Sequence, residues 1–236
     1  MDLRHGDCLC PLTGLATIES NSIDLILTDP PYGTTANKWD IVIPLDKLFE
    51  QYNRIIKDNG AIVLFSSQPF TTDLINANRK MFRYEIIWDK NIGTNFLNAN
   101  KMPLKSHENI LVFYKKLPTY NPQKTEGKPY KNNRRNSASH LGVAKVEWET
   151  DNKDGLRFPK TVQHFRIDKG LHTTQKPLAL MEWLVKTYSN EGDIVIDSCM
   201  GSGTTGLACQ NLGRRFVGWE MNEAYFKVAS ERLEKK

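Results

Sequence analysis

The chain alternates short apolar runs with segments whose apolar residues recur at helical spacing, and this alternation restricts the fold more than any other feature. The first run, 25–27, is apolar at successive positions and is bounded by turn residues, which is typical of a strand buried on both faces of a parallel sheet. Segment 44–60 then has apolar residues at helical spacing and Gly60 as a stop signal. The pattern predicts an α/β fold.

The alternation runs along most of the chain but is interrupted once. Further strands are expected at 61–67, 82–88, 108–116, 193–197 and 216–220, and further helices at 68–80, 177–189 and 222–236. Residues 117–171 contain several prolines, many Asn and Lys, and little apolar periodicity, which indicates a long irregular insertion. We therefore divide the chain into two halves of one domain, 1–115 and 172–236, and an insertion, 116–171.

Basic residues are concentrated in the insertion. From Lys115 to Lys169 there are 13 Lys and Arg against 6 Asp and Glu, whereas the net charge of the whole chain is +5. A basic excess confined to one loop-like segment favours a polyanion such as nucleic acid as the partner. The candidate DNA contacts are Lys128, Lys131, Arg134 and Arg135.

Several other classes of protein are disfavoured. The four cysteines lack C-x-x-C spacing and no histidines cluster, which argues against a zinc site and against a secreted disulfide scaffold. No apolar run approaches membrane-spanning length, and the N-terminus lacks the pattern of a secretory signal. We expect a cytoplasmic protein that uses no metal.

Residues 24–33 read DLILTDPPYG, and they place polar and aromatic residues directly after the first expected strand. Asp29 would lie at the edge where open α/β sheets bind ligands. The prolines that follow fix the backbone and donate no hydrogen bond, so the carbonyl of Pro30 is a free acceptor, and Tyr32 adds a flat ring. Two acceptors beside a stacking surface suit a nucleobase that carries an NH₂ group. Asp29, Pro30 and Tyr32 are therefore the candidate catalytic residues.

A glycine loop follows the strand expected at 193–197. Gly201, Gly203 and Gly206 have G-x-G-x-x-G spacing, which lets the backbone approach a ligand closely at a helix N-terminus. Glu220 ends the next strand, 19 residues after Gly201, where an acid accepts hydrogen bonds from ribose hydroxyls. Further polar contacts are expected from Ser202, Thr204 and Thr205. A dinucleotide and S-adenosylmethionine both fit this loop.

The stretch HTTQKP favours the second ligand. It places Lys176 just before a helix that starts with Pro177, and a helix N-terminus stabilises a carboxylate. S-adenosylmethionine has a carboxylate and NAD does not. In combination with the glycine loop, Lys176 therefore supports S-adenosylmethionine as the cofactor.

Four stretches together resemble the β class of DNA amino-methyltransferases, and the match spans nearly the whole chain. They are Gly6-Asp7-Cys8, Asp29-Pro30-Pro31-Tyr32, Gln175-Lys176-Pro177 and Asp197 through Thr205. In that family the catalytic half precedes the cofactor half, with a variable DNA-recognition region between them. The order of the motifs in this chain is the same. The resemblance implies a Rossmann-like methyltransferase sheet with an inserted basic DNA-recognition region.

The resemblance also implies roles for particular residues. Asp7 and Cys8 would lie near the cofactor adenine, Glu220 would hold its ribose, and Asp29 with the Pro30 carbonyl would hold the target amine. Where the family usually has Asp-Pro-Phe, this chain has Asp197, Ser198 and Cys199. The expected cofactor site comprises Asp7, Cys8, Asp29, Lys176, Ser198, Cys199, Gly201, Ser202, Gly203, Thr204, Thr205 and Glu220. His107 and Glu108 also resemble a family segment, but we interpret them as a structural pair without a catalytic role.

These features predict an enzyme that transfers a methyl group from S-adenosylmethionine to the N6 amine of an adenine flipped out of double-stranded DNA. The family resemblance also implies a homodimer as a possible state. Four alternatives stay open at this point: an N4-cytosine DNA methyltransferase, an RNA amino-methyltransferase, a NAD-dependent oxidoreductase and a catalytically silent DNA-binding protein. The Asp before Pro-Pro-Tyr makes the family resemblance favour adenine over cytosine. RNA enzymes with a similar tetrapeptide usually place the glycine loop first, so the late position of the loop in this chain argues against them.

Overall fold

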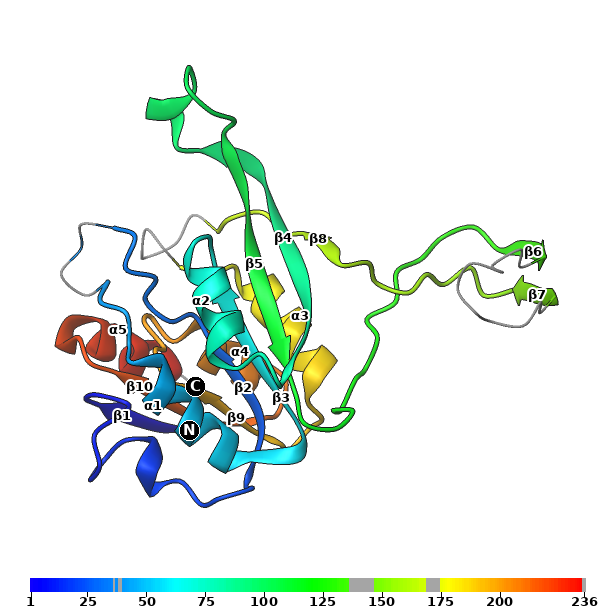
Figure 1. The fold of residues 1–236 in the computed structure, drawn as a ribbon. Coiled ribbons are helices and arrows are strands. Elements are labelled where there is room, and N and C mark those ends of the chain that lie inside the picture. The colour runs from blue at the N-terminus through cyan, green and yellow to red at the C-terminus, as the bar shows by residue number, and fades with distance from the viewer. Residues whose placement is uncertain (36, 38–39, 136–146, 169–174, 235–236) are drawn as a thin grey trace. The chain divides into compact units, whose positions relative to one another are not determined.

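A computed structural model describes residues 1–35, 37, 40–135, 147–168 and 175–234 (Figure 1). Its helices are α1 (Leu45–Ile55), α2 (Phe70–Ala77), α3 (Leu178–Tyr188), α4 (Thr204–Asn211) and α5 (Glu223–Glu234), with short 3₁₀ turns η1 (Leu15–Thr17) and η2 (Phe96–Asn98). Its strands are β1 (Asp2–His5), β2 (Ile23–Thr28), β3 (Ile56–Ser66), β4 (Phe82–Thr94), β5 (Lys105–Phe113), β6 (Tyr130–Arg135), β7 (Glu147–Asn152), β8 (Val162–His164), β9 (Ile194–Asp197) and β10 (Arg215–Glu220). None of the described helices is both long and apolar enough to cross a membrane.

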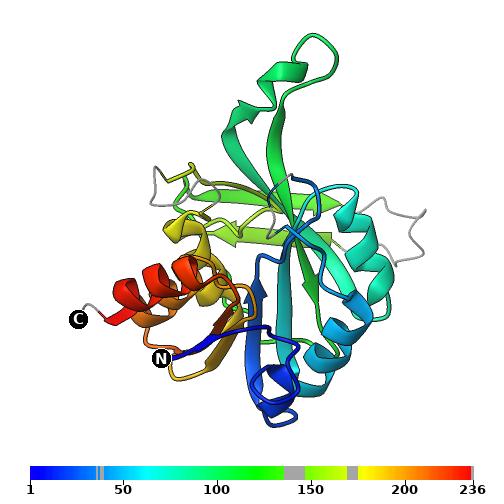
Figure 2. The same ribbon diagram turned by 90° about the vertical axis from the view of Figure 1, so that its left-hand side faces the viewer.

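One sheet organises most of the chain. Its strand order is β1-β10-β9-β2-β3-β5-β4-β8, in which β5 is antiparallel to both neighbours and every other neighbouring pair is parallel. The chain starts at one edge with β1, passes to the centre with β2 and β3, and returns beside β2 with β9 after residue 190. This order brings segments that are far apart in the sequence to one edge of the sheet (Figure 2).

Helices cover both faces of the sheet, as the apolar strands require. Leu25 and Leu27 of β2 belong to a core cluster shared with α3, α4 and α5, whereas Ile26 belongs to a second cluster shared with α1 and α2. All three side chains are fully buried. The expectation of a strand buried on both faces, and of an α/β fold, is confirmed.

The first long helix is shorter than its periodicity predicts. Helix α1 ends at Ile55, and β3 begins at Ile56, so the expectation of a helix up to Gly60 is wrong. The register between β2 and β3 shifts between Ile23 and Leu25, and a Cβ atom on Gly60 would lie 2.8 Å from the carbonyl oxygen of Asp24. Gly60 therefore allows two strands to approach closely and does not end the helix.

The insertion contains more regular structure than its composition suggests. The chain divides into two compact units, one of residues 1–121 with 161–236 and the other of residues 122–160. The second unit contains the antiparallel pair β6 and β7, and Thr125 pairs with Arg157 in an isolated bridge. Residues 162–164 lie in the segment that we expected to be irregular, but they form strand β8, which pairs with β4 in the main sheet. The β6–β7 pair and β8 are short and mostly polar, so they lack the apolar pattern that marks a strand.

Candidate active site

The carboxyl ends of four neighbouring strands hold the predicted site residues. Strands β1, β10, β9 and β2 are parallel neighbours, so the residues that follow them lie along one edge of the sheet. Asp7 and Cys8 follow β1, Glu220 ends β10, the glycine loop follows β9, and Asp29 follows β2. The sheet thus brings together residues that the sequence places more than two hundred positions apart.

The glycine loop connects β9 to α4 and is fixed by Glu220. The Glu220 carboxylate accepts hydrogen bonds from the backbone of Gly201, at 3.0 Å, and from that of Asn222, at 2.7 Å. Burial raises the pKa of Glu220. Each of its oxygens has a second lone pair, so the carboxylate can also accept hydrogen bonds from ligand hydroxyls.

The loop glycines have different roles. Gly201 has φ +52°, and a Cβ atom there would meet nothing within 4 Å, so this position borders open space. A Cβ on Gly203, where φ is +77°, would lie 3.1 Å from Ala229, and one on Gly206 would lie 2.7 Å from Leu233. That all three let the backbone approach a ligand stays a prediction. Gly203 and Gly206 allow α4 to pack closely on α5.

Several hydroxyls of the loop are engaged inside the protein. Thr205 donates a 2.5 Å hydrogen bond to Asp197, and burial raises the pKa of Asp197 to about 7. Thr204 accepts a hydrogen bond from Arg232, and the Ser198 hydroxyl lies 2.5 Å from the hydroxyl of Tyr52. These contacts fix the loop to α1, α5 and the end of β9.

The residues present fit S-adenosylmethionine. Gly201 faces open space, and Glu220 stands where a ribose would be held. Cys8 and Cys199 are free thiols on the same edge, Cys8 buried and Cys199 partly exposed. The side-chain oxygen of Gln175, next to Lys176, is buried and has no hydrogen-bond partner among the described residues. A buried acceptor without a donor fits a site that a ligand with N–H groups completes.

Asp29 lies at the centre of a network of hydrogen bonds. Its Oδ1 accepts a hydrogen bond from the hydroxyl of Tyr32 at 2.7 Å, and its Oδ2 lies 2.5 Å from the ammonium of Lys176. The Tyr32 ring stacks on Phe70 at a centroid distance of 5.4 Å. The carbonyl of Pro30 accepts no hydrogen bond from the part of the chain that the structure describes. An acidic side chain and a free carbonyl therefore stand side by side.

Glu108 joins this network, although the sequence indicated no role for it. Its carboxylate lies 3.3 Å from Lys176 and 2.5 Å from Lys90. Glu108 stands near the beginning of β5, and because β5 runs antiparallel, that end of the strand meets the edge that holds Asp29. The sequence does not reveal the direction of β5, so the structural-pair interpretation missed this position.

The charges in the network support one another. Burial opposes the charge on Lys176, but Asp29 and Glu108 outweigh it and raise the pKa of the ammonium. Burial raises the pKa of Asp29, and Lys176 counteracts this effect. Burial acts in the same direction on Glu108, but the two lysines prevail and lower its pKa. Lys176 is thus a firmly charged partner of Asp29, and the carboxylates that it contacts belong to the protein.

The loop after Tyr32 is stabilised by a residue that we did not predict. The buried carboxylate of Asp40 accepts hydrogen bonds from the backbone of Gly33, Thr34 and Thr35 at 2.7 to 2.9 Å. These bonds outweigh the effect of burial and lower the pKa of Asp40. Asp40 fixes the turn that carries Tyr32 and so helps to position the site.

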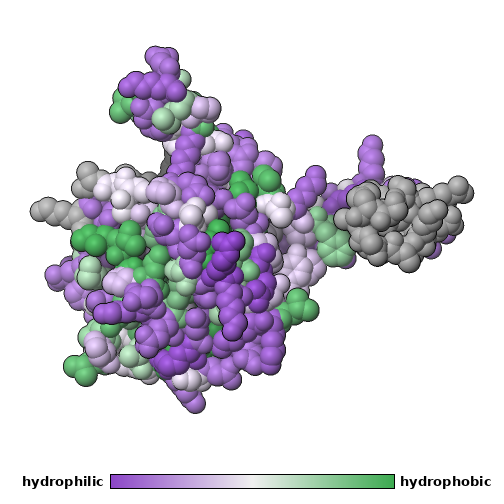
Figure 3. Space-filling model, in the orientation of Figure 1, coloured by the Kyte–Doolittle hydropathy of each residue, from purple (hydrophilic) through white to green (hydrophobic). Residues whose placement is uncertain are grey.

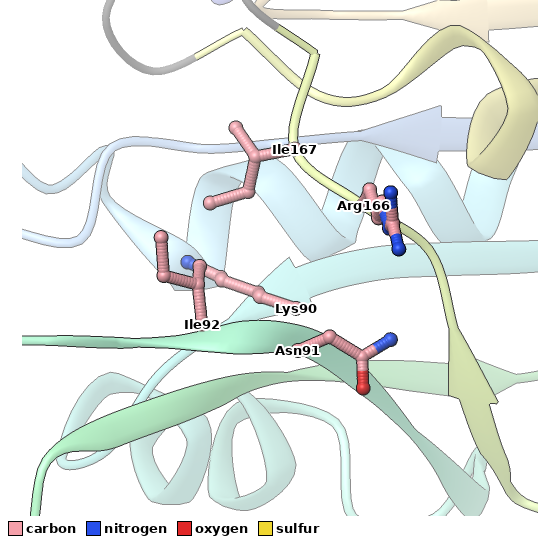
Figure 4. A pocket seen from close by; sticks show the side chains of 5 residues that line it. All are labelled: Lys90, Asn91, Ile92, Arg166 and Ile167. Carbon is pink, nitrogen blue, oxygen red and sulfur yellow. The ribbon is translucent and has the colours of Figure 1, made fainter.

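A hollow adjoins the charged network at Lys90. Its volume is about 320 Å³, at the small end of the range for ligand pockets. It is lined by Lys90, Asn91, Ile92, Arg166 and Ile167 (Figure 4). Ile92 and Ile167 face each other across one side, while Asn91 and Arg166 present polar groups on the other (Figure 4). Arg166 is exposed and has no hydrogen bond or ion pair within the described ranges.

The predicted DNA contacts lie in the unit of residues 122–160. Lys131 is on β6 and forms an ion pair with Glu149, and Arg134 and Arg135 end the same strand. Lys128 stands just before β6 and its carbonyl accepts a hydrogen bond from Arg157. Among the described residues no group of His, Cys, Asp or Glu side chains is arranged to hold a metal ion.

Comparison with known proteins agrees with this geometry. The sequence model of the DNA methylase family matches residues 23–231. The chain belongs to this family. It is 30% identical to the Type II methyltransferase M.HpaI of Haemophilus parainfluenzae over 96% of the chain and 73% of that protein. It is also 30% identical to the DNA adenine methyltransferase YhdJ of Escherichia coli, over 98% of the chain and 81% of that protein.

Solved structures support the fold of this DNA methylase. The M1.HpyAVI complex with S-adenosylmethionine matches with a TM-score of 0.67 and 27% identity, covering 98% of this chain and 99% of the other. The cytosine-N4-specific PvuII methyltransferase matches with a TM-score of 0.70 at 15% identity, over 98% of this chain and 85% of the other, and shows the fold alone. The methyltransferase fold and S-adenosylmethionine as cofactor, both expected from the sequence, are confirmed.

Proposed function

We propose that this DNA methylase methylates the N6 amine of an adenine flipped out of duplex DNA. The observation that carries the proposal is the position of Asp29 and the free Pro30 carbonyl, on the strand next to the glycine loop. The acceptors and the loop share one edge of the sheet, so a base held by the first would face a ligand held by the second.

Methyl transfer to adenine requires that the protein position the target amine and polarise its N–H groups. S-adenosylmethionine, when bound, supplies a sulfonium methyl group whose departure leaves a neutral thioether. The adenine amine is a weak nucleophile because its lone pair is delocalised into the ring. Asp29 and the Pro30 carbonyl would accept hydrogen bonds from its two N–H groups, which favours a pyramidal nitrogen and stabilises the positive charge that grows on it.

The contact between Lys176 and Asp29 supports this role. An ammonium is an N–H donor, as the target amine is, so the structure shows Asp29 already accepting a bond of the required kind. Lys176 has three donors and uses two on the protein carboxylates, which leaves one for the carboxylate of the cofactor. We infer that the cofactor contacts are those expected from the sequence, with Gly201 providing the close backbone approach.

Adenine is favoured over cytosine by two observations. The relative YhdJ is named a DNA adenine methyltransferase and matches nearly the whole chain. Asp, and not Ser, precedes Pro-Pro-Tyr in this sequence. The N4-cytosine alternative is kept because its amine poses the same chemical problem to the same acceptors.

Substitution of Asp29 tests the proposed mechanism. Asp29→Ala should abolish nearly all methyl transfer in a single turnover with labelled S-adenosylmethionine and mixed-sequence duplex DNA. Asp29→Asn keeps the size and one acceptor oxygen but loses the charge, so we expect a loss on the order of a hundredfold. Circular dichroism would verify the fold of both variants. Full activity of a folded Asp29→Ala variant would rule out this mechanism.

A further inference from the structure

The carboxyl-terminal part of β4 and the beginning of β5 extend beyond the sheet as an arm of residues 90–107 (Figures 1 and 2). Both β3 and β4 are antiparallel to β5, so β4 runs parallel to β2 and the arm leaves the sheet at the edge that holds Asp29. The root of the arm also touches the site, because Lys90 pairs with Glu108 and Glu108 with Lys176. The arm therefore stands beside the position proposed for the target base.

The tip of the arm presents large apolar side chains to solvent. Phe96 is 76% exposed, Leu97 83% and Met102 52%. Apolar residues reach the surface at this tip (Figure 3). Exposed apolar groups that gather on one projecting element mark an interaction site more often than scattered ones.

The backbone of the tip is ordered by its own hydrogen bonds. The side-chain amide of Asn98 donates to Oδ1 of Asn95 at 2.8 Å. The backbone carbonyl of Asn98 accepts hydrogen bonds from the backbone of Lys101 and Met102 at 2.8 and 3.0 Å. Thr94 adds a 2.8 Å bond to the Lys105 carbonyl across the two strands. The tip is thus a built turn that holds its apolar side chains outward.

The charge of the arm selects its partner. Residues 90–107 include three lysines and no Asp or Glu. Two copies of a purely basic arm would repel each other in a symmetric contact, whereas DNA would attract it. Basic side chains that flank apolar wedges are the combination by which proteins open base steps.

We propose that the arm inserts Phe96 and Leu97 into duplex DNA beside the flipped base, with Lys101 on a neighbouring phosphate. The proposal rests on the proposed function, because a flipped base leaves a gap in the stack that an apolar side chain can fill. The hollow at the root of the arm adds the polar groups of Asn91 and Arg166 beside Lys90.

The first test separates wedging from other roles of the tip. A Phe96→Ala, Leu97→Ala variant should methylate its fully paired site on the order of tenfold more slowly in a single turnover. A duplex with an abasic site opposite the target base requires less unpairing. On this duplex the rate of the double variant should return to within about twofold of the wild-type rate. Leu117→Ala is the matched control, because Leu117 is also 83% exposed but follows the opposite end of β5. Equal loss on both duplexes, or no loss on either, would overturn the proposal.

The second test does not depend on catalysis. Lys101→Glu should weaken binding of mixed-sequence duplex by about tenfold at low salt and lower the salt slope by about one, as measured by fluorescence anisotropy. Lys80→Glu, at the other end of β4, should change neither quantity. A wild-type chain that methylates no DNA would refute the proposed function and leave this test valid. A Lys101→Glu variant with unchanged DNA binding, or a Phe96→Ala, Leu97→Ala variant that turns a wild-type dimer into monomers, would refute the arm's proposed role.

Discussion

At the scale of single residues, the site depends on the charge that Asp29 keeps while it is partly withdrawn from water. Burial raises its pKa, and Lys176 is the cation that opposes this effect. Glu108 adds a second carboxylate to the same ammonium, and Lys90 balances Glu108 in turn. Removal of one partner would leave a buried charge uncompensated, which costs more than a surface ion pair is worth.

Lys176→Met tests this balance through pH. Without the ammonium, the pKa of Asp29 should rise further, so a larger fraction of the carboxyl is protonated and inactive at neutral pH. Methyl transfer by the variant should therefore be slow near neutral pH and become faster as the pH is raised. The wild type should reach its full rate at a lower pH than the variant. Rates measured in single turnovers across a pH series would show the shift. Lys90→Met, which removes only a partner of Glu108, should shift the profile less. A variant profile that is lower at every pH but unshifted would contradict this role.

Tyr32 combines two functions that substitution can separate. Tyr32→Phe removes the 2.7 Å hydrogen bond to Asp29 but keeps the ring, so we expect a moderate loss of activity. Tyr32→Ala also removes the stacking surface, worth about 1–3 kcal/mol by comparison with bases stacked on aromatic residues in single-strand binders. At saturating DNA, the methyl-transfer rate should be highest for the wild type, lower for Tyr32→Phe and lowest for Tyr32→Ala. Equal rates for the two variants would mean that the ring does not contact the base.

At the scale of elements, sequence reasoning succeeded where one pattern determines one structure. The buried run 25–27 and the strand ending at Asp197 place Asp29 and the glycine loop correctly, because apolar strands end at turn residues. Strand direction is not encoded in such a pattern, and so Glu108 at the start of β5 was missed. The different roles of Gly201 and Gly203 also depend on packing against α5, which the sequence does not show.

The β6–β7 pair carries the second element-scale prediction. Replacement of Lys131, Arg134 and Arg135 by Glu should weaken DNA binding and flatten its salt dependence, because fewer phosphates are neutralised. S-adenosylmethionine affinity should stay near the wild-type value. Anisotropy titrations with duplex DNA at several salt concentrations, with calorimetry for the cofactor, would measure both. An unaltered salt slope would place the phosphate contacts on another surface.

At the scale of the whole molecule, the two halves of the site meet only because the sheet is not built in chain order. Strand β9 joins β2 after the chain has completed the other side of the sheet, and residues 122–160 form a unit of their own between the two halves. In the sequence, the catalytic motif precedes the glycine loop. In the sheet, the strands that carry these two motifs, β2 and β9, are neighbours. The internal pairing of the insertion was not predictable, because its short strands are polar.

This division predicts that the inner part of the second unit is dispensable for folding. Thr125 and Arg157 exchange backbone hydrogen bonds of 3.0 and 2.8 Å, so a two-residue Asn-Gly turn can replace residues 126–156. The shortened chain should fold cooperatively and bind S-adenosylmethionine, but its affinity for DNA should fall. Thermal unfolding and calorimetry would test this, and a shortened chain that fails to fold would show that the insertion stabilises the sheet.

The most direct test of the proposed function follows the methyl group. The protein is incubated with labelled S-adenosylmethionine and unmethylated mixed-sequence duplex DNA, and the DNA is then digested to nucleosides and separated by chromatography. We expect label in N6-methyldeoxyadenosine, with almost none in the Asp29→Ala control. Label in N4-methyldeoxycytidine, or DNA without label, would contradict it.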